Sequence, residues 1–181
     1  MGKVLILIVD MQYGFQNAFT EKLDQKILRF LDQLKEKEDN LLIAGTCYVN
    51  HEQTACYRFE GWKSCMDGTE EARIIDSLLP RMQRVFRKDR YSCWNEEMQR
   101  FVQENEIEKV YFTGVNTGCC VLHSAFDFYN ALVDCSVIAD LCASTSGIRE
   151  HEAALIVLQS CITKERVILA DQAVEEIRAL L

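Results

Sequence analysis

Short apolar runs alternate with amphipathic stretches along the whole chain, and this alternation constrains the fold more than any other feature. Six apolar runs predict strands, at 3–9, 41–49, 83–87, 109–113, 134–139 and 166–169. Six stretches predict helices, at 21–38, 69–79, 95–105, 119–131, 148–161 and 172–181. Because near-continuous apolar strands are buried on both faces, the pattern predicts an α/β fold with a parallel sheet covered by helices on both sides.

Length and composition predict a single domain that spans residues 1–181. The chain has one Pro and eight Gly, so we expect no long linker, and 49% of its residues are apolar, which is enough for a full core. The longest irregular stretch, 50–68, is rich in aromatic residues and cysteine. It forms either a pocket wall or a surface loop that its own side chains pack.

Charge and cysteine content indicate where such a chain works. Its net charge of −8 argues against nucleic acid as a partner and weakens a role at a membrane surface. No apolar run approaches the roughly 20 residues of a spanning helix. Nine cysteines, an odd number without a Cys-x-x-Cys pair or a secretion signal, favour free thiols and a cytoplasmic location.

Two charged residues stand at the ends of predicted strands, where open parallel sheets bind their ligands. Asp10 directly follows the run VLILIV, where a carboxylate is costly unless it is paired or used. It could also simply cap the following turn. Lys88 ends the run RVFRK, but a lysine there is often a solvated charge, and Arg87 and Arg90 lie close by.

The segment YFTGVNTGCCVLHSAFDFYN passes from a strand through a Gly-rich turn into a helix, and Cys120 lies at the start of that helix. The partial positive charge and free N–H groups of a helix N-terminus favour a thiolate, so we expect a lowered pKa for Cys120. The same N–H groups could hold an oxyanion. The alternative is a tight turn with two core cysteines. His123 could share a helix face with Cys120, and His51 could reach a pocket.

Three separated blocks of the chain resemble the isochorismatase-like cysteine hydrolases, the superfamily that includes nicotinamidases and N-carbamoylsarcosine amidase. The blocks are LILIVDMQYGF, VFRKDRYSCW and TGVNTGCCVLHSAFDFYNAL, and VIADLCAST followed by EHEAAL resembles the family downstream. They occur in the family's order and cover most of the chain.

The resemblance implies a three-layer α/β/α sandwich whose six-stranded parallel sheet has the order 3-2-1-4-5-6. It implies Cys120, and not Cys119, as the nucleophile, Asp10 as the general base and Lys88 as its support. It further implies a cis peptide bond between Val115 and Asn116, with the backbone N–H groups of Asn116 and Cys120 forming an oxyanion hole. The reaction would be cleavage of a carbon–nitrogen bond through an acyl-enzyme, without a cofactor.

Two departures from the nicotinamidase pattern bear on the substrate. Gly118 stands where nicotinamidases usually have Asp, and the region YVNHEQTACYRF has His51 but no Asp-x-His before a second His. We therefore expect no metal. The resemblance makes Phe15, Trp62 and Tyr91 candidate substrate-binding residues, and it leaves aromatic amides, carbamoyl compounds and other small amides open.

Other classes of function remain as alternatives. The chain could be a catalytically silent family member that acts as an interaction or oligomerisation module, which thiol reactivity would reveal. A nucleotide-binding protein is unsupported, because neither a Gly-x-Gly-x-x-Gly nor a Gly-x-x-x-x-Gly-Lys motif is present. A redox protein is unsupported, because no resolving cysteine stands at an ordinary spacing. By analogy with the family, we expect a small-molecule amide as the substrate and a homo-oligomer, a dimer or larger.

Overall fold

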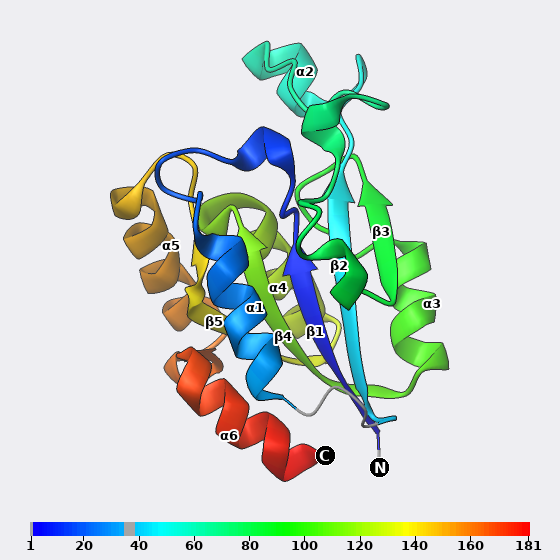
Figure 1. The fold of residues 1–181 in the computed structure, drawn as a ribbon, viewed down its shortest axis with the longest axis vertical. Helices are drawn as coiled ribbons and strands as arrows, with labels where there is room; N and C mark the ends of the chain where they lie inside the picture. The colour runs from blue at the N-terminus through cyan, green and yellow to red at the C-terminus, as the bar shows by residue number, and fades with distance from the viewer. Residues whose placement is uncertain (1, 35–38) are drawn as a thin grey trace.

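Six strands in the order β3-β2-β1-β4-β5-β6 form one parallel sheet in the computed structural model, which describes residues 2–34 and 39–181 (Figure 1). The strands are β1 (Lys3–Val9), β2 (Leu41–Tyr48), β3 (Arg84–Lys88), β4 (Ile107–Val115), β5 (Asp134–Ala143) and β6 (Val167–Ile168). The predicted parallel sheet and its strand order are confirmed.

Helices cover both faces of this sheet because its central strands are apolar on both. In β1, the even-numbered side chains from Val4 to Ile8 pack in one core and the odd-numbered side chains from Leu5 to Val9 pack in the other. Each such buried side chain contributes roughly 1.5–3 kcal/mol to folding. The first core is covered by α1 (Leu23–Gln33) and α6 (Ala170–Leu180), and the second by α3 (Glu96–Glu104), α4 (Leu122–Asn130) and α5 (Ile148–Cys161). In the described parts of the chain, no helix is both long and apolar enough to span a membrane.

Strand register places the carboxyl ends of four strands together. Ile8 of β1 lies beside Gly45 of β2 and Thr113 of β4, and Tyr48 near the end of β2 pairs with Lys88 at the end of β3. The connections that leave these ends, including the segment with α2 (Ala55–Glu60), gather at one edge of the sheet (Figure 1). Residues far apart in the sequence therefore meet there.

The helix predicted from Thr69 to Leu79 is wrong. Only short helical turns occur there, at Glu70–Ala72 and Leu79–Arg81. Around Ile74 the chain is extended, because Ile74 packs beside Cys47 whereas Ile75 packs in the core under α1, and residues 76–78 then form a turn. Adjacent side chains that face opposite directions require an extended backbone. This segment also forms backbone hydrogen bonds with the chain that follows β1.

Smaller differences occur at element ends. The predicted helix 21–38 ends at Gln33, and residues 35–38 lie outside the described residues. The stretch 50–68 contains the short helix α2, which Thr54 caps by accepting a hydrogen bond from the Tyr57 N–H. The helix predicted at 119–131 starts with a single π-helical turn, Thr117–Val121, and continues as α4.

At Gly114, strands β4 and β1 approach so closely that there is no room for a side chain. Its φ is +106°, and a Cβ there would collide with the carbonyl oxygen of Val9. We expect Gly114→Ala to lower the free energy of unfolding by about 3 kcal/mol or more, measured by urea denaturation. The control is Gly61→Ala, where φ is +68° but nothing lies within 4 Å, so the loss should be only about 1 kcal/mol. Equal losses would contradict the close approach.

Candidate active site

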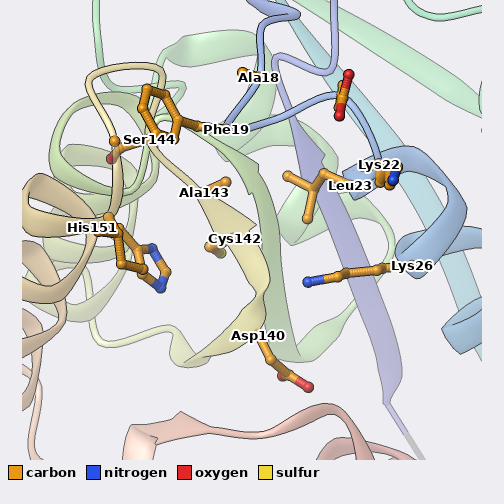
Figure 2. Close-up of a pocket in the computed structure, with 13 residues that line it drawn as sticks. Ala18, Phe19, Lys22, Leu23, Lys26, Asp140, Cys142, Ala143, Ser144 and His151 are labelled. Carbon is orange, nitrogen blue, oxygen red and sulfur yellow. The ribbon is translucent and has the colours of Figure 1, made fainter.

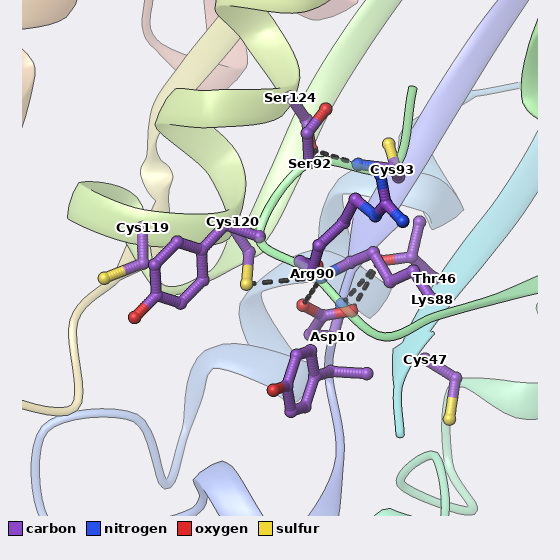
Figure 3. A network of polar contacts seen from close by, with 12 residues as sticks. Asp10, Thr46, Cys47, Lys88, Arg90, Ser92, Cys93, Cys119, Cys120 and Ser124 are labelled. Atoms are coloured by element: carbon purple, nitrogen blue, oxygen red, sulfur yellow. Dashed lines mark hydrogen bonds and ion pairs between the residues drawn. The ribbon is translucent and has the colours of Figure 1, made fainter. Parts of the chain in front are cut away.

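Three predicted site residues come together at the carboxyl edge of the sheet. Asp10 follows β1, Lys88 ends β3, and Cys120 lies in the π-helical turn after β4. The Lys88 Nζ lies 2.7 Å from the Asp10 Oδ2 and 3.3 Å from the Cys120 Sγ (Figure 3). The structure thus joins the three side chains through one ammonium group.

This group of charges is buried. The exposed fractions of the Lys88 and Asp10 side chains are 1% and 0%, and Cys120 is 5% exposed. A buried charge is stable only when it is paired and hydrogen-bonded. Lys88 satisfies this by pairing with Asp10 and by donating a second hydrogen bond to the carbonyl oxygen of Arg90, at 3.0 Å.

Thr46 holds the Asp10 carboxylate from the other side. Its hydroxyl donates to the Asp10 Oδ1 at 2.6 Å and accepts a hydrogen bond from the Asp10 N–H at 3.2 Å (Figure 3). Asp10 itself has a φ of +47°, in the left-handed region that a non-glycine residue rarely adopts. Asp is one of the few non-glycine residues that adopt this conformation, and conformations of this kind cluster at functional positions.

The expectation of a lowered pKa for Cys120 is wrong. Burial is the largest influence and raises the pKa of this thiol; the Lys88 ammonium lowers it and the Asp10 carboxylate raises it, so that it lies well above its ordinary value. Burial would also lower the pKa of Lys88, but the Asp10 carboxylate and the Cys120 sulfur raise it overall. The resting site therefore pairs an ammonium with a carboxylate and keeps the proton on sulfur.

The turn that precedes Cys120 is fixed by its own contacts. The Val115–Asn116 peptide bond is cis. The Asn116 side chain accepts a hydrogen bond from the Thr145 N–H at 2.8 Å, and the Asn116 carbonyl accepts from the Cys119 N–H at 3.0 Å. The predicted oxyanion hole at Asn116 and Cys120 stays a prediction.

A cavity of about 380 Å³ opens beside the Cys120 sulfur. The three candidate substrate-binding residues Phe15, Trp62 and Tyr91 all line it, together with Tyr48 and Asn116. The rings of Phe15 and Trp62 stack with centroids 5.6 Å apart and planes 15° apart. Sequence 50–68 therefore supplies part of a pocket wall. The part these rings play in substrate binding stays a prediction.

Sequence reasoning missed several residues that shape this site. Gln12 is fully buried and joins three backbone groups, since its amide donates to the carbonyls of Tyr48 and Ala72 and accepts from the Tyr48 N–H. Thr46 was hidden within an apolar strand. Glu60 and Glu150 line the cavity from elements that are distant in sequence. Of these residues, only Thr46 had a signal in the sequence, because it is a polar residue inside an apolar strand.

The histidines lie apart from the buried trio. His51 contacts Asp89 at 3.5 Å and Gln53 at 2.9 Å, and the exposed His123 donates to the Cys119 carbonyl. Across residues 2–34 and 39–181, no group of three or more His, Cys, Asp and Glu side chains could hold a metal ion. The donors present near His51 do not fit the metal site of nicotinamidases, so we derive no step through a metal.

The sequence of this chain matches that of a known protein family over most of its length. Residues 4–166 match the model of the isochorismatase domain. The chain belongs to the isochorismatase family. A nicotinamidase from Acinetobacter baylyi is 32% identical, over 76% of this chain and 79% of the relative.

Solved structures of this family share the fold. An isochorismatase-like hydrolase from Alkaliphilus metalliredigens superposes with a TM-score of 0.83 at 22% identity, covering 97% of this chain and 99% of the other. An N-carbamoylsarcosine amidase from Thermoplasma acidophilum gives 0.78 at 18% identity, covering 93% and 97%. The chain therefore has the isochorismatase-like fold over nearly its whole length.

The hydrogen bond from Thr46 should contribute to stability because Asp10 is buried. We expect Thr46→Val to lower the free energy of unfolding by about 1–3 kcal/mol, measured by urea denaturation. The matched control is Thr113→Val, since Thr113 is also fully buried but its hydroxyl has no hydrogen-bond partner among the described residues. That variant should be as stable as the original or slightly more so; an equal loss in both would show that the Asp10 contact contributes little.

The raised pKa of Cys120 predicts slow alkylation. Only the thiolate reacts, so iodoacetamide at pH 7 should modify the exposed Cys161 well before the buried Cys120, and the Cys120 rate should rise with increasing pH. Peptide mass spectrometry over time measures both sites in one sample. Faster modification of Cys120 at pH 7 would show that its thiolate is already formed in the resting site.

Proposed function

We propose that the protein is a cofactor-free cysteine amidohydrolase that cleaves the carbon–nitrogen bond of a small amide or ureido substrate. One observation carries the proposal: the Lys88 ammonium contacts both the Asp10 carboxylate and the sulfur of Cys120, and Cys120 lines a cavity. The family relation supports it, since the similar proteins include a nicotinamidase and an N-carbamoylsarcosine amidase.

The first half of the proposed reaction forms an acyl-enzyme. Asp10 accepts the proton of the Cys120 thiol as the sulfur attacks the substrate carbonyl carbon. The N–H groups of Asn116 and Cys120 stabilise the oxyanion. Asp10 then gives the proton to the substrate nitrogen, and the carbon–nitrogen bond breaks. Ammonia or an amine departs, and the acyl group remains bound to the Cys120 sulfur as a thioester.

The second half returns the enzyme to its resting state. A water molecule gives a proton to Asp10 and attacks the thioester carbon. The carbon–sulfur bond breaks, the sulfur takes the proton back, and the acid product leaves. Lys88 stays protonated throughout, because its raised pKa keeps the ammonium that holds the carboxylate in place.

The test is ammonia release from a panel of small amides that includes nicotinamide and carbamoyl compounds. We expect Cys120→Ala to lose turnover by about 10³-fold or more. Cys119→Ala should retain turnover, and Cys161→Ala, at the exposed end of α5, controls for general effects of cysteine loss. Parallel assays with EDTA should give the same rates. Full turnover by Cys120→Ala would refute the proposed nucleophile.

The alternative of a silent interaction module makes a different prediction for the same panel. It predicts no turnover by the original protein and no dependence on Cys120. We further propose a cytoplasmic location, since all nine cysteines are free thiols, and a dimer or larger assembly, which light scattering of the purified protein measures.

A further inference from the structure

The wall of the cavity beside Cys120 carries charge of one sign. Its charged side chains are Glu60, at the end of α2, and Glu150, in the first turn of α5. Among the described residues that line it there is no Lys, Arg or His. Lys88, whose Nζ lies 3.3 Å from the Cys120 sulfur, does not line this cavity and is already paired with Asp10. A negatively charged substrate would therefore meet repulsion in this cavity.

Glu150 carries the one carboxylate of this cavity wall that has an unpartnered buried oxygen among the described residues. Its Oε2 is buried and has no hydrogen-bond partner within the described residues. Glu60 differs, because it accepts a hydrogen bond from the Tyr91 hydroxyl at 3.0 Å. An unpaired buried carboxylate oxygen is costly, so its position in a cavity wall points to a group that the substrate supplies.

The catalytic turn makes room for Glu150. A Cβ on Gly118 would lie 2.8 Å from the Glu150 Oε1, so the carboxylate sits directly against the turn that holds Cys120. Cys119 in the same turn responds to this charge, because burial first and then the Glu150 and Glu60 carboxylates together raise the pKa of its thiol to about 11. The negative potential therefore extends to the nucleophile's side of the cavity.

Aromatic rings complete a surface that suits a cation. Phe15, Trp62, Tyr48 and Tyr91 line the same cavity as Glu150. The faces of such rings attract ammonium and pyridinium groups, most strongly where water is excluded. The Tyr48 ring already contacts one cation, since the Lys88 Nζ lies 5.2 Å from its centroid.

We infer that the substrate amide carries a positively charged group and that Glu150 is the residue that selects it. This inference rests on the proposed amide hydrolysis for the reaction itself, but not for the preference in binding. The scissile carbonyl lies at Cys120 while the cationic group lies between the Glu150 carboxylate and the aromatic walls.

A second cavity in the same molecule has a wall of mixed charge. This cavity, of about 430 Å³, lies between α1 and α5 and contains none of the three residues Asp10, Lys88 and Cys120 (Figure 2). Lys22, Lys26 and His151 line it, together with Glu21 and Asp140. Its mixed charge does not single out a cation, so the preference should depend on Glu150 and not on the residues of the second cavity.

Three amides of one shape test the inference. They are meta-carbamoyl-N-methylpyridinium, which is cationic, meta-methylbenzamide, which is neutral, and meta-carbamoylbenzoate, which is anionic. Calorimetric titration of the Cys120→Ala protein measures binding without turnover, and ammonia release by the unsubstituted protein measures kcat/KM. We expect the cation to bind at least about tenfold more tightly than the neutral amide, and the anion to bind most weakly.

Glu150→Gln should abolish this discrimination by weakening binding of the cation alone. Its matched control is Glu152→Gln, the same change on the same helix at an exposed position, which should leave the preference intact. Gly118→Ala is a second variant that leaves the charge in place but moves the carboxylate, so it should reduce the preference in part.

The outcomes separate the two proposals. Equal binding of the three amides, or an equal loss for all three in Glu150→Gln, would overturn the charge inference, since the carboxylate would then serve a group common to all amides. A preference in binding without turnover of any amide would sustain the inference and count against amide hydrolysis. Turnover that depends on Cys120 but ignores charge would do the reverse.

Discussion

The buried contact between Lys88 and Asp10 is the interaction on which the rest of the structure depends. An ammonium and a carboxylate that are both withdrawn from water are stable only if each finds its partner at hydrogen-bond distance. Asp10 comes from the end of β1 and Lys88 from the end of β3, with β2 between them. The pair is therefore formed only when three strands are in register, and Thr46 of the middle strand contacts the carboxylate directly.

Much of the fold could be predicted because the buried strands have continuous apolar sequences. The apolar sequence of β1 has one physical interpretation, a strand covered on both faces, and the structure has it. The segment after Thr69 was harder, because two adjacent apolar residues, Ile74 and Ile75, fit a helical pattern as well as an extended one. Contacts with the chain after β1, sixty residues away, decide between the two, and no local signal reports them.

The site residues were harder to predict from the sequence than the strands were. Position alone left Asp10 and Lys88 with ordinary alternatives, and the resemblance to a family singled them out. The pKa of Cys120 was predicted in the wrong direction, because the helix N-terminus is visible in sequence whereas the depth of burial and the neighbouring carboxylate are not. Glu150 escaped notice for a similar reason: only folding brings its carboxylate against Gly118 and the turn that holds Cys120.

The place of β3 at the edge of the sheet has a consequence for motion. An edge strand of five residues has one neighbour to hold it, and such strands open locally at lower free energy than central ones. Each opening would carry Lys88 away and leave Asp10 as an unpaired charge in the interior, which is costly. We therefore expect the charged pair to raise the free energy of local opening of β3 toward that of global unfolding. The amide hydrogens of this strand should then exchange with solvent more slowly than is usual for an edge strand.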